Sequence, residues 1–218
     1  PRSTLFPYTT LFRSELFGVA EIGPDERDES DEPNEFLHVT DALNGQNGSM
    51  KIQDITDGRT FKEFEVGFRL YISDSTCCGD ADDTSPAHRP ADGWSLSIGN
   101  DLPDTIGLPE EGTGNGIRIC FDTWDSGGGE APAIDVWNGV EGEVGDGSQD
   151  SWSGGLFVRQ KFDGVTSAKA EEKFTDPDTG EFVFMWTHGE WVDFSLKVYG
   201  GRIVINYKGY EMINEELP

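Results

Sequence analysis

The chain of 218 residues contains 42 acidic and 16 basic residues, and its formal net charge of −26 at pH 7 excludes nucleic acid as a partner, because phosphates would be repelled. The same charge argues against anionic membrane surfaces, and no apolar run approaches the ~20 residues that a membrane helix needs. The 28 glycines and 11% of aromatic residues predict an all-β protein. The acidity indicates either a secreted protein adapted to salty water, which we favour, or several calcium-binding loops.

The first 14 residues, PRSTLFPYTTLFRS, have neither a helical nor a strand period. They resemble the translation of a common sequencing adapter, and we interpret residues 1–14 as an artefact rather than as a disordered natural N-terminus. Residues 15–218 are then predicted to form a single domain. On this interpretation the true start of the protein, with any signal peptide, is missing from the sequence.

Strand patterns follow one another along the rest of the chain. An acidic stretch at 23–35 is predicted to be a long exposed loop, and the clearest strand covers 64–72, where apolar residues recur at every second position. Near the end, Gly200 and Gly201 separate two strand patterns and suit the positive φ angles of a tight hairpin turn. About ten strands predict a two-sheet antiparallel sandwich. The other predicted strands cover 93–99, 116–124, 132–139, 156–162, 191–199 and 202–207.

The chain contains three cysteines, Cys77, Cys78 and Cys120. No Cys-x-x-Cys pair exists, so a zinc site is not expected. A bridge from Cys77 or Cys78 to Cys120, a strained bridge between the adjacent pair and no bridge at all are equally compatible with the sequence.

Three segments in order carry a family resemblance: PADGWSLSIG from Pro90, GTGNGIRICFDTWDSGGGEAPAIDV from Gly112, and GEWVDFSLKVYGGRIVINYKG from Gly189. Together they resemble the concanavalin A-like lectins and glucanases, in particular the L-type lectins and the lectin-like modules of bacterial surface proteins. The resemblance covers about 36–217 and implies a jelly-roll sandwich. Bacterial modules of this kind usually carry one more strand after the point where this chain ends, so we expect a C-terminally truncated domain with an exposed sheet edge and poor solubility.

In L-type lectins an Ala-Asp-Gly turn meets a Phe-Asp-Thr strand, and together they hold calcium and sugar. The resemblance therefore implies that Asp92 contacts the sugar and the water molecules bound to the metal. It implies that the carboxylate of Asp122 is the main calcium ligand and that the Trp124 carbonyl is a further calcium ligand. Ser126 stands where the family has an asparagine, and Cys120 stands where legume members have a glutamate, so no transition metal is expected. The predicted ligand-binding residues are Asp92, Gly93, Trp94, Trp124 and Ser126, and the predicted metal ligands are Asp92, Asp122, Trp124 and Ser126.

Calcium requires about 6–8 oxygen ligands, and even with Asp125 or Glu130 this set would need water to complete it. The alternative is that Asp92 caps a turn and that Asp122 accepts hydrogen bonds from loop amides. The stretch at 176–180, DPDTG, is interpreted as a hairpin turn, because no glutamate downstream completes a calcium loop. Trp94 and Trp124 are the best candidates for stacking on a sugar, whereas Trp191 faces either solvent or the concave sheet.

Glycosidases of this fold place their acids in a Glu-x-Asp-x-x-Glu pattern on one strand, and the chain lacks that pattern. Glu63 and Glu65 are predicted to point outward, and Glu190 and Asp193 to lie on opposite faces. We therefore expect a non-catalytic module, extracellular or on the cell surface, that binds glycan or cell-surface polysaccharide within a larger bacterial protein. The alternatives are a glycan-cleaving enzyme with an unusual acid pair and a purely structural spacer. The ligand and the oligomeric state are not predicted.

Overall fold

A computed structural model describes residues 14–24, 35–41, 43, 45–53, 56, 58–72, 93–104, 111–114, 116–123, 131–138, 156–161, 173–175, 182–185, 187 and 190–217. Within these residues the regular structure consists of strands in antiparallel sheets, so the all-β prediction is confirmed. The chain divides into two compact units, Pro1–Phe61 with Asp104–Leu108 and Lys62–Pro103 with Pro109–Pro218, which are described separately. The two-unit division does not decide the single-domain prediction.

The first unit contains two pairs of short antiparallel strands, β1 (Ser14–Gly18) with β4 (Gly48–Ile52) and β2 (Glu21–Pro24) with β3 (Glu35–His38). Strand β1 begins at the last residue of the segment assigned to the adapter. The predicted loop at 23–35 is too long at both ends, because Gly23 pairs with Phe36 and Pro24 with Glu35. Residues 25–34 lie outside the described part of the chain.

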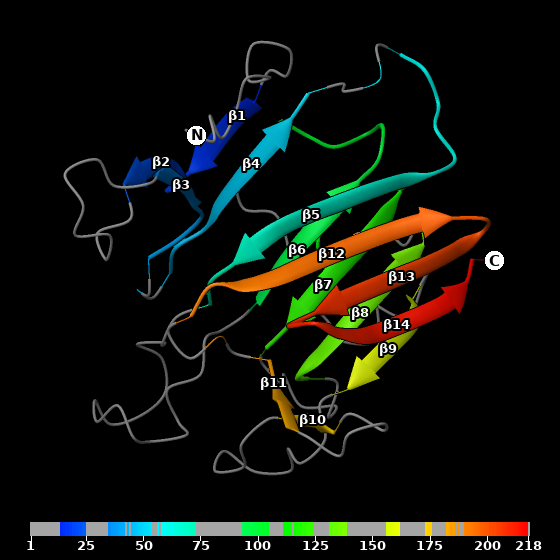
Figure 1. The fold of residues 1–218 in the computed structure, drawn as a ribbon. Coiled ribbons are helices and arrows are strands. Elements are labelled where there is room, and N and C mark those ends of the chain that lie inside the picture. Colours follow the sequence, from blue (N-terminus) through cyan, green and yellow to red (C-terminus); the bar gives the residue numbers. More distant parts are fainter. Residues whose placement is uncertain are drawn as a thin grey trace, which may run out of the picture. The chain divides into compact units, whose positions relative to one another are not determined.

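In the second unit, the first four-stranded sheet has the order β14-β13-β12-β5 (Figure 1). Its hairpins turn tightly: φ is 56° at Gly200 and 76° at Gly201, as predicted, and it is 54° at Lys208 and 85° at Gly209. The strands are β5 (Phe64–Leu70), β12 (Val192–Tyr199), β13 (Arg202–Tyr207) and β14 (Tyr210–Glu216).

The second sheet of this unit has the order β6-β7-β8-β9, and all its pairs are antiparallel. Its strands are β6 (Gly93–Ile98), β7 (Ile117–Asp122), β8 (Ala133–Asn138) and β9 (Leu156–Lys161). They confirm the strands predicted over 93–99, 116–124, 132–139 and 156–162. A further short pair joins β10 (Lys173–Thr175) to β11 (Phe182–Phe184).

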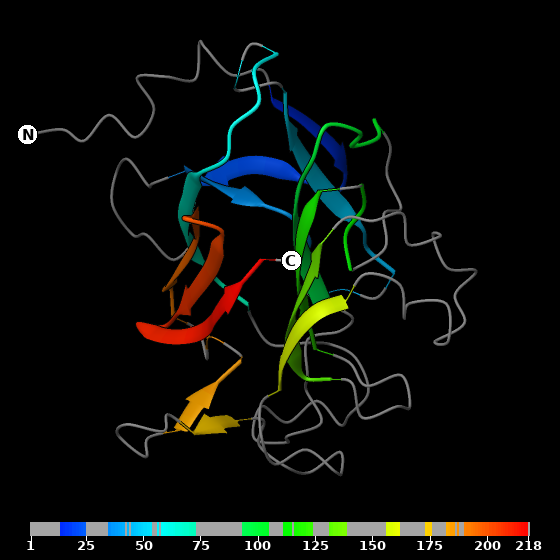
Figure 2. The ribbon, with the colours of Figure 1, turned by 90° about the vertical axis from the view of Figure 1, so that its right-hand side faces the viewer.

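The two four-stranded sheets share one hydrophobic core and face each other in Figure 2. Phe121 of β7 contacts Phe194 of β12 at a ring-centroid distance of 5.8 Å and Tyr207 of β13 at 5.1 Å. Strand β5 alternates half-buried and exposed side chains along its whole length, as predicted, because only one of its faces meets this core. The architecture is therefore sandwich-like. The buried core residues are Ile119, Phe121, Ile134, Val136, Met185, Phe194, Leu196, Val198, Ile203, Ile205, Tyr207, Met212 and Ile213.

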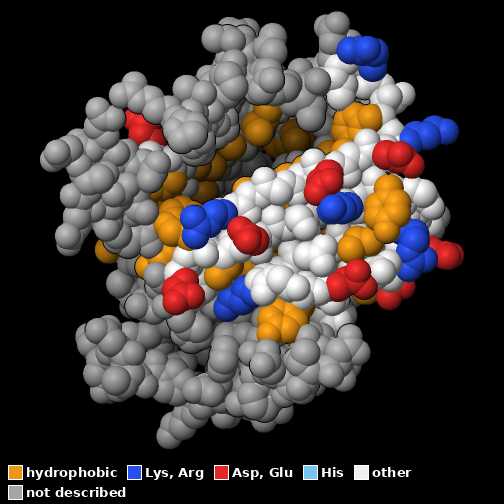
Figure 3. Space-filling model, in the orientation of Figure 1, with side chains coloured by type: hydrophobic (Ala, Val, Ile, Leu, Met, Phe, Trp, Pro, Cys, Tyr) orange, Lys and Arg blue, Asp and Glu red, His pale blue; other side chains and the backbone are white. Residues whose placement is uncertain are grey.

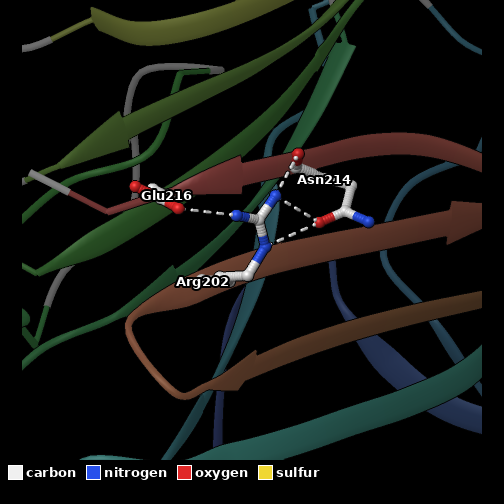
Figure 4. A network of polar contacts seen from close by, with 3 residues as sticks. All are labelled: Arg202, Asn214 and Glu216. Atoms are coloured by element: carbon white, nitrogen blue, oxygen red, sulfur yellow. Dashed lines mark hydrogen bonds and ion pairs between the residues drawn. The ribbon is translucent and has the colours of Figure 1, made fainter.

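The outer face of the β14-β13-β12-β5 sheet carries acidic and basic side chains side by side (Figure 3). Glu65 forms an ion pair with Lys197 at 3.0 Å, and its side chain is 60% exposed, so the outward direction predicted for it is confirmed. Arg202 donates to both the backbone and side-chain oxygens of Asn214 and pairs with Glu216 at 3.1 Å, which links β13 to β14 (Figure 4). Acidic and basic side chains mixed in this way are typical of a surface that faces solvent, and neither sign of charge dominates its electrostatic potential.

Two buried side chains close the core next to β11. The Tyr207 hydroxyl donates to the carbonyl of Met185, and burial raises the pKa of this phenol. The Thr187 hydroxyl donates to the carbonyl of Ile72 at 2.8 Å and accepts from the Ile72 amide at 3.1 Å. One threonine therefore satisfies both backbone groups of the residue that lies two positions beyond the end of β5.

Candidate functional site

The predicted lectin-type site lies where β6 begins and β7 ends. Gly93 pairs with Asp122, and Asp122 in turn pairs with Ala133 at the start of β8. The start of β6 and the end of β7 therefore lie at the same end of the sheet, which we call the rim. Asp92 immediately precedes Gly93 but lies outside the described residues.

Only glycine fits at position 93, because a larger residue would clash with the neighbouring strand. Its φ is 154°, and a Cβ atom at this position would lie 2.3 Å from the Phe121 carbonyl oxygen. Real Cβ atoms do not approach backbone oxygens so closely, and side chains rarely adopt this φ. The glycine of the Ala-Asp-Gly turn is thus required by the close approach of β6 to β7.

Asp122 is a buried carboxylate, with 6% of its surface exposed, and the following Thr123 is 1% exposed. Both residues make polar interactions in the structure. Among the residues that the structure describes, no three His, Cys, Asp or Glu side chains converge as a metal site would require. Trp124 and Ser126 lie outside the described residues, as do Asp92 and the further candidates Asp125 and Glu130.

Trp94 occupies a different place from the one its predicted role needs. Its ring stacks on Phe121 at 4.5 Å with an interplanar angle of 21°, and it meets Phe68 at 5.9 Å and Phe194 at 5.8 Å. It belongs to the partly buried residues packed against the core. The structure therefore gives Trp94 a packing role between the sheets, because the core face of β6 carries every second residue from Trp94 onward.

Trp191 is half-buried, and its neighbours come from the end of β5 and the residue after it. Its ring is 5.6 Å from that of Tyr71, and the Arg69 guanidinium lies 5.9 Å from its centroid. Arg69 Nη2 also donates to the Trp191 carbonyl at 3.2 Å. The three side chains stabilise the end of β5 against the start of β12.

Sequence reasoning missed a second set of polar residues, on the face of the β6-β7-β8-β9 sheet that points away from the core. Cross-strand pairing aligns these side chains in two rows, and we call them the polar face. The signal was present in the alternation of IRICFD and AIDVWN, in which every second residue is apolar. The first row is Ser95, Cys120 and Asp135, and the second row is Ser97, Arg118 and Trp137.

Three residues of the polar face are buried, and the other three, Ser95, Ser97 and Arg118, are half-buried. Asp135 is 1% exposed, Trp137 3% and Cys120 0%. Cys120 forms no disulfide bond in the structure, so the alternative of a bridge from Cys77 or Cys78 to Cys120 is not realised. Cys77 and Cys78 themselves lie outside the described residues. Both faces of β8 from Ala133 to Trp137 are therefore removed from water, which is unusual for a strand of an antiparallel sheet with polar alternation.

The loop at 111–114 lies against the serine end of the polar face. The Thr113 amide donates to Ser97 Oγ at 3.1 Å, and a Cβ atom on Gly112 would lie 2.5 Å from the same oxygen. Burial lowers the pKa of Arg118, while the charges of Glu111 and Cys120 act in the opposite direction. Arg118 is thus a half-buried cation beside Glu111.

Two N–H donors on the polar face have no acceptor. The Arg118 guanidinium carbon lies 5.3 Å from the centre of the Trp137 ring, so the two side chains are neighbours on β7 and β8. Arg118 Nε and Trp137 Nε1 are both buried without a hydrogen-bond partner in the described structure. Each such group costs about 1–3 kcal/mol, and native proteins contain few of them.

Comparison of the chain with known protein families, with curated proteins and with solved structures found no match. Among the described residues no helix is long and apolar enough to cross a membrane.

Proposed function

We propose that this chain is a non-catalytic carbohydrate-binding or adhesion module with a concanavalin A-like jelly-roll fold, taken from a larger secreted or surface-exposed bacterial protein. The observation that supports the proposal is the pairing of Gly93, the last residue of the Ala-Asp-Gly sequence, with Asp122 of the Phe-Asp-Thr sequence. The steric requirement for glycine at position 93 adds to it.

In this proposal the rim holds both sugar and calcium. Asp122, whose carboxylate is buried at the end of β7, is the main metal ligand. Asp92, Ser126 and the carbonyl of Trp124 complete the site with water. Carboxylate, carbonyl and hydroxyl oxygens are the donors that calcium prefers, and bound calcium would supply a fixed positive charge that orders the loops. No transition metal is part of the proposal.

A glycan array with and without a chelator tests this function. We expect binding to one class of neutral glycan that falls in EDTA and in Asp122→Asn, because the amide loses the charge that calcium needs. Asp193→Asn is the matched control, since Asp193 is exposed on the other sheet. Loss of binding in both variants, or binding that ignores Asp122 and EDTA, would contradict a lectin-type rim site, and no binding to any glycan would favour a structural spacer.

One observation favours glycan cleavage as a second candidate. Asp122 and Asp135 lie on the same face of neighbouring strands, two positions apart in register, and both are buried. The backbones of diagonal neighbours in a sheet lie about 7–8 Å apart, so the two carboxyl groups can adopt the separation of about 6.5–9.5 Å that inverting glycosidases use. Release of reducing ends from a polysaccharide panel, lost in Asp135→Asn, would establish this activity, and no release would exclude this acid pair.

A further inference from the structure

We propose that Asn47 and Gly48 form a self-modifying site, at which the folded chain converts Asn47 to aspartate and isoaspartate through a cyclic succinimide. The reaction needs an asparagine side chain and, directly after it, a backbone nitrogen that no side chain shields. Glycine favours the reaction because it has no Cβ atom and its backbone rotates freely. Water is the only co-reactant. The inference concerns the first unit and does not depend on the proposed lectin-type function.

The structure leaves the Gly48 nitrogen outside the ladder of hydrogen bonds between β1 and β4. Asn47 is exposed, and its carbonyl accepts a hydrogen bond from the Val19 amide at 3.1 Å. The residues that follow and precede this bond, Gly48 and Gly18, are opposite each other in the pairing register. Because antiparallel residues alternate between hydrogen-bonded and non-hydrogen-bonded pairs, the bond makes this pair a non-hydrogen-bonded one. The Gly48 nitrogen therefore points away from β1.

The conversion has two stages and involves no oxidation or reduction. In the first, the Gly48 nitrogen attacks the side-chain amide carbon of Asn47, a new C–N bond forms and the bond to the side-chain nitrogen breaks. That nitrogen takes the proton of the Gly48 N–H and leaves as ammonia. In the second stage, water opens the ring at one of its two carbonyl carbons. One opening gives aspartate, and the other gives isoaspartate, in which the main chain runs through the former side chain.

One hydrogen bond restrains the peptide group that must rotate for the ring to close. The Asn47 carbonyl belongs to the same peptide group as the Gly48 nitrogen, so its bond from Val19 holds both in place. This bond lies at the end of a two-stranded sheet, and Val19 itself follows the last residue of β1. The ends of two-stranded ribbons open easily, because few neighbouring interactions oppose the opening. Cyclisation therefore needs a local opening and not the unfolding of the chain.

The fold also requires the glycine that makes Asn47 reactive. A Cβ atom at position 48 would lie 1.9 Å from the Val39 carbonyl oxygen and 3.1 Å from the Ala20 nitrogen. Any other residue would clash with these backbone atoms. Isoaspartate lengthens the main chain by a methylene group next to the carbonyl that accepts from Val19. The converted chain then cannot restore the original register of β1 and β4, so the change is one-way.

The experiment incubates the full chain at mildly alkaline pH and follows each asparagine by peptide mass spectrometry, with fragmentation that separates aspartate from isoaspartate. The dipeptide Asn-Gly also occurs at 44–45, 115–116 and 138–139, so fragment ions assign the conversion to one residue. The chain in denaturing urea gives the reference rate. We expect folded Asn47 to convert within about tenfold of that rate. Asn206 and Asn214 should stay unchanged, because tyrosine and glutamate follow them.

Asn47→Gln is the matched variant, because it keeps the amide but needs a larger ring that closes far more slowly. It should abolish the conversion at this position and leave the other Asn-Gly dipeptides unaffected. Amide hydrogen exchange along β1 should become faster as the parent chain is incubated, and it should stay constant in Asn47→Gln. An Asn47 that persists in the folded chain while the urea-unfolded chain converts would overturn the proposal. Conversion that leaves hydrogen exchange of β1 unchanged would overturn the one-way loss of pairing.

Discussion

Gly93 has the strictest steric requirement among the single residues of the rim. Its φ of 154° and the Phe121 carbonyl oxygen together leave no space for a side chain. Gly67 in β5 provides the contrast, because a Cβ atom there would meet only the Phe194 carbonyl oxygen, at 3.8 Å. The sequence contains both glycines inside strand patterns, and only the backbone geometry separates the required one from the replaceable one.

We therefore predict that Gly93→Ala lowers the free energy of unfolding by about 2 kcal/mol or more, because the strand must move away from β7 or adopt a strained φ. Gly67→Ala should leave stability unchanged or raise it by about 0.5 kcal/mol, since alanine loses less entropy on folding. Urea denaturation of both variants against the parent chain measures the difference. Equal effects of the two substitutions would refute the steric argument for Gly93.

At the scale of elements, the β13–β14 turn contains the one non-glycine residue with positive φ in the described structure, Lys208 at 54°. Its ammonium lies 5.6 Å from the centre of the Tyr207 ring. Burial lowers the pKa of Lys208 to about 8, and the nearby Glu190 opposes that shift. The turn thus places a partly desolvated cation on the hairpin.

This lowered pKa predicts how stability depends on pH. Between about pH 8 and the ordinary value of 10.5, the unfolded chain binds a proton at Lys208 that the folded chain has lost, so raising the pH favours the folded state. Relative to Lys208→Gln, the parent chain should gain about 1 kcal/mol across this window once solvent screening is allowed for, and below pH 8 the difference should stay constant. Parallel pH profiles for the two chains would contradict the prediction.

The strands of the second unit could be predicted from the sequence because their core-facing residues alternate with few exceptions. In β5 this alternation matches the burial of each side chain. The burial of the polar face could not be predicted, since Asp135 and Trp137 alternate with apolar residues and so indicated a solvated face, yet both are buried. The bounds of the short strands in the first unit were not predicted, because these strands form separate pairs and leave apolar residues such as Ile22 and Ile52 about half exposed.

At the scale of the whole molecule, a net charge of −26 acts on every folded arrangement of the chain. Repulsion among surface carboxylates opposes the compact state, and salt shortens its range from about 10 Å at 0.1 M to about 3 Å at 1 M. The ion pairs of Glu65 with Lys197 and of Arg202 with Glu216 oppose the repulsion only locally, since both involve exposed acids.

We therefore predict that sodium chloride raises the melting temperature between 0.05 M and 1 M, by about 2–4 °C for each kcal/mol of repulsion removed. Chloride is preferred to sulfate for this measurement, because sulfate also strengthens apolar burial. A melting temperature that falls or stays constant would contradict adaptation of this chain to salty water. Calcium chloride that stabilises beyond sodium chloride of equal ionic strength would favour the calcium-loop explanation of the acidity.

The paired hydrogen bonds between Thr187 and Ile72 have a consequence for local opening of the sheet. The pairing of β5 with β12 ends at Leu70 with Val192, two positions before Ile72. Beyond that pair, the Thr187 hydroxyl takes the place of a strand as partner of the Ile72 amide and carbonyl. Replacing that hydroxyl with a methyl group would remove this partner from both backbone groups, so amide exchange at this end of β5 would become faster than in the rest of the sheet.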